Sequence, residues 1–554
     1  MLKQMLYGAS LGALALLAPL ACDVSFAQEM PLAGDYERDG QIRHVLLISI
    51  DGMHAIDLAN CVKGGYCKNL AELRETGLNF TAASTSKPSD SFPGLTALVT
   101  GGSPKSTGAF YDVSYDRALS PPAKTNAVSG IPGGASLCPS VVGTQIGMDE
   151  SIDIDVTKLD AGGGIDPDYL PRDPKNNCAP VYPHSFIHVN TMFEVVKAAG
   201  GYTAWTDKHQ SYELAKGRSG NGVNDFYAPE INSIPMALPQ VKLLACSPLP
   251  DQTAVSKSNA YTDSFANVKC YDALKVQATL NQIDGLDHTG AAHTRVPNVF
   301  GMNFQAVSVG QKLNEKKINV IGGYKDAIGT PSAALEDEIK FVDKSIGQMV
   351  EELKDRGLYK STAIIITAKH GQSPIDPKRI LRIPADDSTK KAPSDLVATN
   401  QALEDDVSLM WLKDRSATGL ANAVATLESN ARTVGADGGE IFYGPTLDLM
   451  FGQGAAASRV PDIIVEPNVG VVYTGGTKKL AEHGGFAHDD TNVMMLVSNP
   501  HVEPRTIYAT VQTAQVAPTV LKLLGLDPMK LEAVREEGTQ ILPGIGGLVE
   551  HEQH

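Results

Sequence analysis

Two uninterrupted apolar runs constrain the fold of this chain more than any other feature. The first, "HVLLISIDG" at residues 44–52, ends at Asp51, and the second, "AIIITAKHG" at residues 363–371, ends at Lys369 and His370. A strand with both faces buried is apolar throughout, whereas a half-exposed strand alternates between apolar and polar residues. Both runs therefore predict buried strands of a parallel sheet that helices cover on both faces.

Helix patterns alternate with such strands along the chain. Residues 335–353 place apolar side chains at steps of four and three from Leu335 to Leu353, which is typical of an amphipathic helix. Residues 190–206 combine a helix with a following strand, and residues 511–526 form an apolar helix near the end of the chain. This alternation predicts an α/β fold, with a mostly parallel central sheet between helix layers.

Residues 400–470 depart from this alternation. Their pattern indicates a strand, a helix and two further strands, at residues 407–412, 419–434, 440–443 and 462–465. Short strands next to one helix are typical of an α+β unit. We therefore expect one large domain over residues 28–554, with a small α+β lobe inserted at about 400–470.

The first 27 residues have the composition of a secretory signal peptide. Lys3 supplies a positive charge, residues 11–21 are apolar, and Ala27 ends a small-x-small cleavage motif. A membrane anchor is the alternative, but the apolar run is shorter than the roughly 20 residues that a membrane-spanning helix needs. We expect residues 1–27 to be removed and the mature protein to be periplasmic or secreted, without a membrane span.

Cysteine usage agrees with export. The chain has seven cysteines, and Cys22 lies in the predicted signal peptide, which leaves an even number. An even set in an exported protein suggests disulfides, with free buried thiols as the alternative. Proximity in sequence alone favours one pairing among those that six cysteines allow. That pairing joins Cys61 to Cys67, Cys138 to Cys178 and Cys246 to Cys270.

The charge balance excludes one class of partner. The formal net charge is −16 and the isoelectric point is near 5.3. A surface that binds a nucleic-acid polymer needs clustered lysine and arginine, and no dense basic run is present in the sequence. We therefore expect a small-molecule partner and not a nucleic acid.

Polar residues at strand ends and at one helix start are the candidate site. Ligands of open α/β sheets bind beyond the carboxyl ends of the strands, where Asp51, Lys369 and His370 are expected to lie. Ser91 precedes Phe-Pro-Gly and the apolar segment 94–100, and a serine at a helix N-terminus lies in a field that favours its alkoxide. Alone, Ser91 would be read as a simple helix cap.

The order of the motifs changes that interpretation. "IDG" at 50–52, "SFPG" and "LVTG" within 91–101, a late strand ending in "HG" at 370–371, and "EHGGF" at 482–486 follow one another along the chain. This order resembles the alkaline-phosphatase superfamily, and most closely its type I phosphodiesterase/nucleotide pyrophosphatase branch. The resemblance covers roughly residues 42–527.

The resemblance implies roles for individual residues. It implies that Asp51, His370 and His483 are metal ligands, and that Ser91 is the nucleophile and a further ligand. The family's asparagine that holds a phosphoryl oxygen falls at Asp112, a changed residue. These residues would attack a phosphate ester through serine and stabilise the charge that develops on phosphorus.

Three departures from the family pattern put its two-metal site in doubt. Lys369 stands where the family has a metal-binding aspartate, and Val307 and Gln311 stand where it has aspartate and histidine. Two carboxylates are lost and one ammonium is gained, so one metal ion or none balances the charge better than two. Zinc suits the histidine ligands best, with calcium or magnesium as alternatives. We expect Lys369 to take part of the missing cation's place and to bind an anionic oxygen.

A second basic pair follows the strand that ends near Thr206. Lys208 and His209 are similar to a Lys/His segment with which sulfatases of the same superfamily hold their anion. The sulfatase modification motif is missing, because Leu95 stands where that motif has arginine. The plainer alternatives are a solvated loop for this pair, a surface position for Lys369 and a turn for Asp112.

The sequence therefore predicts an exported hydrolase of phosphate mono- or diesters with an altered, one-metal site. A sulfatase or phosphonate hydrolase of the same superfamily is one alternative. A degenerate, non-catalytic protein that keeps an anion pocket is the other, because three of the family's metal-ligand side chains are absent.

Overall fold

The computed structural model describes residues 41–134, 138–238, 246, 260–383, 389–452, 455–474 and 479–549. The predicted signal peptide, residues 1–27, lies outside the described residues. Within the described ranges, no helix combines the length and the apolar character needed to cross a membrane.

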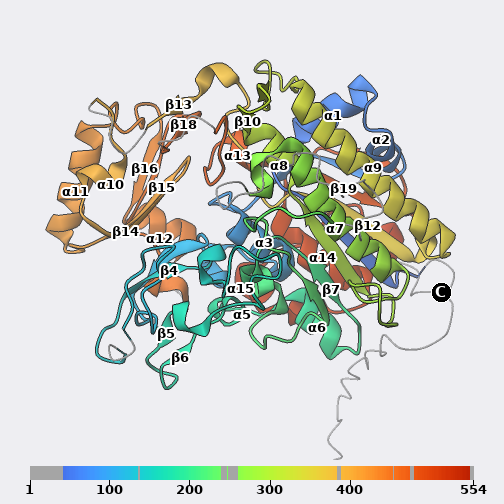
Figure 1. Cartoon of the computed structure of the whole chain (residues 1–554), viewed down its shortest axis with the longest axis horizontal. Coiled ribbons are helices and arrows are strands. Elements are labelled where there is room, and N and C mark those ends of the chain that lie inside the picture. The colour runs from blue at the N-terminus through green and yellow to red at the C-terminus, as the bar shows by residue number, and fades with distance from the viewer. Residues whose placement is uncertain are drawn as a thin grey trace, which may run out of the picture. The chain divides into compact units, whose positions relative to one another are not determined.

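The main sheet confirms the mostly parallel α/β fold (Figure 1). Its strands follow the order β20-β2-β19-β12-β1-β9-β7-β8, and β21 also pairs with β2. Only β19 runs antiparallel to its neighbours, β12 and β2. The bounds are β1 (His44–Ile50), β2 (Leu78–Ser84), β7 (Ala204–Thr206), β8 (Asp225–Tyr227), β9 (Val299–Phe304), β12 (Thr362–Thr367), β19 (Asn492–Ser498), β20 (Arg505–Ile507) and β21 (Val511–Gln512).

Strand β1 lies between β12 and β9 and pairs with both in parallel. In this register Ser49 lies opposite Thr367 on one side and Asn303 on the other. The carboxyl ends of the three strands therefore reach the same edge of the sheet, which is where ligands of such sheets bind. Asp51 follows β1 at that edge.

Both faces of the sheet are buried. Side chains of β1 alternate between two hydrophobic clusters, with Val45 and Leu47 in one and Leu46 and Ile48 in the other. One cluster is built with α3 (Ser91–Thr100), α6 (Met192–Ala198) and α14 (Val516–Leu523), and the other with α7 (Phe265–Ile283), α8 (Ala306–Lys312) and α9 (Ala333–Asp355). The predicted layers of helices are confirmed.

The region around 400–470 has a sheet of its own. Its order is β14-β15-β17-β16, antiparallel throughout. The sequence pattern missed β14, whose side chains are all only half-buried, so no apolar run marks it. Its description as an inserted lobe stays a prediction. The bounds are β14 (Thr399–Glu404), β15 (Ser408–Leu412), α11 (Ala417–Ser429), β16 (Glu440–Tyr443), α12 (Pro445–Phe451) and β17 (Ile463–Glu466).

One helix begins later than the sequence pattern predicts. The apolar run from residue 511 was expected to be helical, but Val511–Gln512 forms β21 and pairs with β2. Helix α14 begins only at Val516. The apolar run is continuous because the edge strand and the helix after it are both packed against the core, and burial does not distinguish the two.

Shorter elements complete the described chain. Four two-stranded pairs are β3 (Val113–Asp116) with β4 (Thr144–Gly147), β5 (Arg172–Asp173) with β6 (Ala179–Pro180), β10 (Asn314–Glu315) with β11 (Val320–Ile321), and β13 (Leu381–Arg382) with β18 (Val471–Val472). The remaining α-helices are α1 (Ala55–Gly64), α2 (Lys68–Glu75), α4 (Pro104–Thr107), α5 (Pro183–Phe186), α10 (Pro393–Leu396), α13 (His488–Thr491), α15 (Glu532–Glu537) and α16 (Gly546–Val549).

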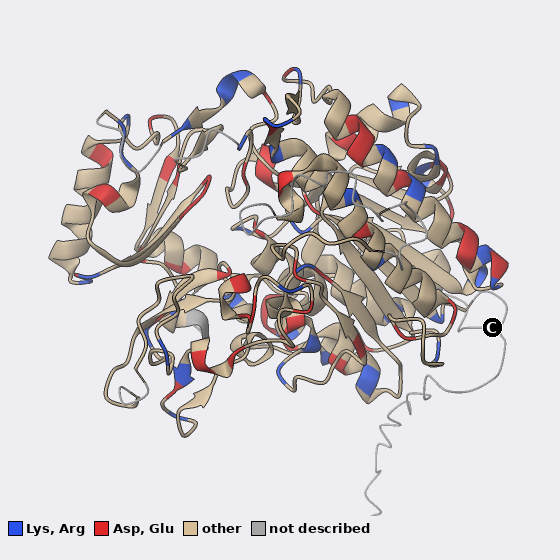
Figure 2. Ribbon diagram, in the orientation of Figure 1, with Lys and Arg blue, Asp and Glu red and all other residues tan. Residues whose placement is uncertain are grey.

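All three predicted disulfides are confirmed. Cys61 bonds Cys67, Cys138 bonds Cys178, and Cys246 bonds Cys270. Pairing between sequence neighbours was thus the correct choice. Acidic and basic residues are interspersed along the described elements (Figure 2).

Candidate active site

Ser91 is the first residue of α3, and its surroundings hold the helix start in place. Asp90 caps the helix by accepting a hydrogen bond from the Phe92 amide at 2.9 Å. A Cβ on Gly94 would lie 2.2 Å from the Lys369 carbonyl oxygen, so this glycine lets α3 begin directly against the end of β12. Ser91 is 3% exposed and lies at the positive end of the helix dipole.

Three groups surround the Ser91 hydroxyl. Its Oγ lies 2.9 Å from Lys208 Nζ and 3.0 Å from His370 Nε2. It also lies 3.5 Å from Asp51 Oδ2. Residues that are far apart in sequence thus meet at one hydroxyl, because β1, β7 and β12 deliver them to the same edge of the sheet. The hydroxyl has a potential proton acceptor on one side and a cation on the other.

His370 is arranged to accept a proton from Ser91. Its Nδ1 lies 2.8 Å from the Gly371 carbonyl oxygen and donates to it, which leaves the Nε2 lone pair facing Ser91 Oγ. Burial, followed by the neighbouring His483, lowers the pKa of His370 to about 4. The imidazole is therefore neutral at ordinary pH and can serve as a general base.

Asp51 is fully buried and is held by two side-chain amides. Asn303 Nδ2 donates to its Oδ1 at 2.6 Å, and Gln305 Nε2 donates to its Oδ2 at 2.6 Å. Burial alone would raise the pKa of Asp51, but the charges of Lys369 and Lys208 outweigh it and hold the pKa well below its usual range. Asp51 is therefore a carboxylate.

Sequence reasoning missed Asn303 and Gln305. Asn303 lies in β9, Gln305 follows that strand as the residue before α8, and both side chains reach the Asp51 carboxylate. In the sequence, the signal is a pair of amide side chains where an apolar strand ends. This signal points to the site only once β9 is known to pair with β1.

Lys208 and Lys369 differ in what they contact. Lys208 Nζ reaches Ser91 Oγ and lies 3.4 Å from Asp51 Oδ2, whereas Lys369 Nζ lies 2.8 Å from Asp207 Oδ1. Lys369 is fully buried, and its ammonium also lies 4.2 Å from the centre of the Tyr212 ring. The surface alternative for Lys369 is therefore wrong. Its role as an anion contact stays a prediction, because its ammonium is already paired with Asp207.

His209 points to a carboxylate and not to Ser91. Its Nδ1 lies 2.9 Å from both carboxylate oxygens of Glu230, a side chain with no exposed surface. Burial raises the pKa of Glu230 to about 8. The pair fixes the orientation of the His209 ring, and the predicted role of His209 in anion binding remains untested.

His483 packs beside His370, with the two ring centroids 4.0 Å apart. Its Nδ1 lies 3.1 Å from Asp90 Oδ1, so the residue that caps α3 also orients this imidazole. Asp112 stands among carboxylates: burial, and then the charge of Asp90, raise its pKa well above the usual range. A protonated Asp112 can donate a hydrogen bond, as the family's asparagine does, and this role is a prediction.

The remaining family positions have become structural. Val307 is fully buried in a hydrophobic cluster, and Gln311 Nε2 donates to the Gly52 carbonyl at 2.7 Å and to Tyr324 Oη at 2.8 Å. Among the described residues, no group of three or more histidine, cysteine, aspartate or glutamate side chains is arranged to hold a metal ion.

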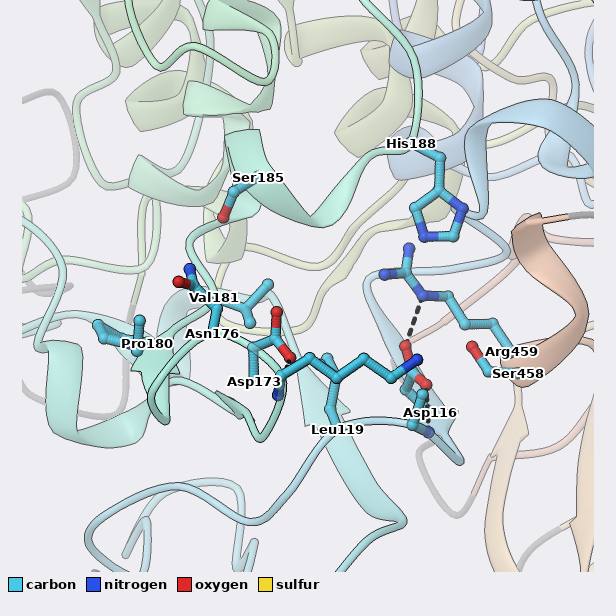
Figure 3. A pocket seen from close by; sticks show the side chains of 13 residues that line it. Asp116, Leu119, Asp173, Asn176, Pro180, Val181, Ser185, His188, Ser458 and Arg459 are labelled. Atoms are coloured by element: carbon cyan, nitrogen blue, oxygen red, sulfur yellow. Dashed lines mark hydrogen bonds and ion pairs between the residues drawn. The ribbon is translucent and has the colours of Figure 1, made fainter. Parts of the chain in front are cut away.

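A cavity of about 540 Å³ lies elsewhere, between the end of β3, the 173–188 segment and residues 458–459 (Figure 3). The buried cation in its lining, Arg459, is engaged: Nε donates to Asp116 Oδ2 at 2.6 Å and Nη1 to the Phe186 carbonyl at 2.5 Å. None of the candidate residues described above lines this cavity. The hydrogen bonds of Arg459 connect the 455–474 segment to β3 and to α5.

Comparison with protein families identifies the family of this chain. The model of the type I phosphodiesterase/nucleotide pyrophosphatase family matches residues 45–133 and 272–489, together more than half of the chain. These ranges include Asp51, Ser91 and His370, and also His483. A search of curated proteins found no significant match.

Solved structures with the same fold include murine ectonucleotide pyrophosphatase/phosphodiesterase 5. The TM-score is 0.52 at 12% sequence identity, over 88% of this chain and 96% of that chain. An inactive threonine-to-alanine variant of the murine protein in complex with AMP gives the same values. At this identity the likeness shows the fold alone.

Proposed function

Because the chain belongs to the type I phosphodiesterase/nucleotide pyrophosphatase family, we propose that it is an exported phosphoester hydrolase whose nucleophile is Ser91. The observation that carries the proposal is the position of Ser91 Oγ, 3.0 Å from a neutral imidazole and 2.9 Å from an ammonium. A serine needs an adjacent base or cation to become a nucleophile, and this hydroxyl has both.

The geometry supports a two-step displacement. Ser91 Oγ attacks phosphorus while its proton passes to His370 Nε2, and the bond to the ester oxygen breaks. The leaving oxygen takes up the proton from His370, which yields a phosphoseryl or nucleotidyl-seryl intermediate. A water molecule, deprotonated by His370, then attacks phosphorus, and Ser91 Oγ departs with the proton. Lys208 and the start of α3 stabilise negative charge on Ser91 and on the phosphoryl oxygens.

The substrate class is a small-molecule phosphoester. The murine enzyme of the same fold was solved with AMP, which supports a nucleotide or a phosphoester of similar size as the substrate here. Three disulfides support export to an oxidising compartment, and periplasmic location is a prediction. The divalent ion implied by the family resemblance also remains a prediction.

A sulfate ester is the second candidate substrate. The observation that favours it is Lys208, which contacts the nucleophile as the resemblance to sulfatases implies. A panel that contains both nitrophenyl phosphate esters and nitrophenyl sulfate separates the two candidates.

The test is hydrolysis of nitrophenyl phosphate mono- and diesters by the mature protein, beside Ser91→Ala and the nearby control Ser86→Ala. We expect turnover by the wild type and the control, and a loss of at least about a thousandfold for Ser91→Ala. Acid quenching during turnover should trap a phosphorylated Ser91, detectable by mass spectrometry. Equal turnover by Ser91→Ala would make another group the nucleophile, and an inactive wild type on every phosphoester would reject the hydrolase.

A further inference from the structure

At Asp51, the central metal ligand of the family pattern, protein donors occupy both lone-pair positions of Oδ2 and one of the two on Oδ1. Oδ2, the oxygen nearer Ser91, accepts from Gln305 Nε2 at 2.6 Å and lies 3.4 Å from Lys208 Nζ. Oδ1 accepts from Asn303 Nδ2 at 2.6 Å. A carboxylate oxygen has about two lone-pair positions, so Oδ2 has no position left for a metal ion.

The orientation of the two amides is fixed. Gln305 Nε2 also donates to Asn303 Oδ1 at 2.5 Å, which turns the NH₂ ends of both side chains toward Asp51. The backbone beneath them is anchored to α7, because Asp272 Oδ2 accepts from the Gln305 and Ala306 amides, each at 2.8 Å. The donors at Asp51 are therefore built into the fold.

An ammonium stands where a metal ion would bridge Ser91 and Asp51. Zinc binds oxygen at about 2.0–2.2 Å, so an ion bound to both Ser91 Oγ and Asp51 Oδ2 would lie close to Lys208 Nζ and be repelled by it. Lys208 Nζ donates to both of these oxygens, at 2.9 Å to Ser91 Oγ and at 3.4 Å to Asp51 Oδ2.

Each lysine of the site already has a carboxylate partner. Asp51 and Asp207 carry two negative charges, and Lys208 and Lys369 carry two positive charges. A divalent ion would add two positive charges beside lysines that are already paired, which is costly in the interior, and the nearby buried carboxylate of Asp90 already lies 3.1 Å from His483 Nδ1. Val307 stands where the family has an aspartate ligand, so this position supplies no negative charge to a metal ion.

We propose that Lys208 takes the place of the metal ion at Ser91, and that Asn303 and Gln305 hold Asp51 as the counter-ion of this lysine. This proposal rests on the proposed function only for the identity of the nucleophile. The residues present do not fit a metal ion between Ser91 Oγ and Asp51 Oδ2, and Lys208, not Lys369, supplies the positive charge next to Ser91.

The first test is metal binding by the full mature protein, and it needs no turnover. After dialysis against EDTA, zinc is titrated by calorimetry into wild type and Asp51→Asn, and bound metal is counted by elemental analysis. We expect the zinc bound per chain to differ by less than about 0.1 ion between the wild type and Asp51→Asn. One zinc ion per wild-type chain that is lost in Asp51→Asn would overturn the proposal. If Asp51→Asn binds as much zinc as the wild type, and removal of that zinc leaves turnover unchanged, the proposal is supported.

The second test is turnover of the phosphoester that the wild type hydrolyses. We expect EDTA to leave turnover within about twofold and Lys208→Met to lower kcat at least about a hundredfold. The matched control is Lys216→Met, since Lys216 pairs with Glu213 at 3.5 Å and does not reach Ser91. Full turnover by Lys208→Met, or its abolition by EDTA with recovery on zinc addition, would refute the proposal. An inactive wild type would reject the proposed function alone, because the zinc titration still decides this inference.

Discussion

Two buried lysine–aspartate pairs lie on either side of the segment 303–306, and they differ in what the lysine faces. In α7, Lys275 Nζ lies 2.9 Å from Asp272 Oδ1 and donates to the Asn303 carbonyl at 2.5 Å, so this pair holds backbone. At the edge of the sheet, Lys208 lies 3.4 Å from Asp51 and donates to the Ser91 hydroxyl.

The difference lies in exposure and in the third partner. The side chains of Lys275 and Asp272 have no exposed surface, whereas Lys208 is 12% exposed. A sealed pair whose third partner is a backbone carbonyl can only stabilise the fold. A pair that opens to solvent and contacts a nucleophilic hydroxyl can also stabilise charge during a reaction. A buried ion pair therefore indicates function only when its lysine also contacts a reactive group, as Lys208 contacts the Ser91 hydroxyl.

The largest change in stability is expected when the ammonium of the α7 pair is removed. Lys275→Met leaves Asp272 buried without a counter-charge, and we expect the free energy of unfolding to fall by about 3 kcal/mol. Urea unfolding followed by circular dichroism measures this change. Turnover per folded molecule should fall much less than in Lys208→Met. A change in unfolding free energy below about 1 kcal/mol would show that the α7 pair is not structural.

The pH dependence of turnover tests the role of His370, which lies beside the Lys208–Asp51 pair. His370 must be neutral to accept the Ser91 proton, and burial holds its pKa at about 4. We expect kcat/KM to be flat with respect to His370 from pH 5 to 7, and to fall about tenfold per unit below pH 4. An initial-rate pH profile checks this. An ascending limb centred between pH 6 and 7 would mean that a different base operates.

Lys369 provides a smaller test, because its ammonium is paired with Asp207 and does not contact Ser91 directly. Asp207 accepts from Lys369 Nζ at 2.8 Å and from the Lys208 amide at 3.0 Å, so Lys369 positions the loop that carries Lys208. We expect Lys369→Met to lower kcat/KM about tenfold, less than Lys208→Met. Steady-state kinetics of both variants decide the order. Equal losses would make Lys369 a direct contact of the reacting anion.

The smallest effect is expected for an exposed pair. Lys340 lies 2.6 Å from Glu336 on the outer face of α9, and the two side chains are 48% and 34% exposed. Solvent screens such a pair, so Lys340→Met should change the free energy of unfolding by less than about 0.5 kcal/mol. The same urea titration that measures Lys275→Met measures this variant. A loss as large as that of Lys275→Met would show that burial is not what separates the two lysines.

Much of the fold could be predicted from the sequence. The apolar runs at 44–52 and 363–371 are neighbouring parallel strands, and the helix predicted at 335–353 is α9. Continuous apolarity and a helical period are direct consequences of burial, so they are visible in the residues themselves. Strand β14 was missed for the complementary reason, since its half-buried side chains carry no apolar pattern.

The residue pattern alone was enough to predict the α/β architecture, the pairing of the six cysteines and the candidate residues Asp51, Ser91 and His370. The contact of Lys208, and not Lys369, with Ser91 is seen only in the folded chain, as are the amides of Asn303 and Gln305 at Asp51. The physical reason is that burial and period leave a regular trace along the chain. The direction of a long charged side chain depends instead on which opposite charges the folded strands bring within its reach.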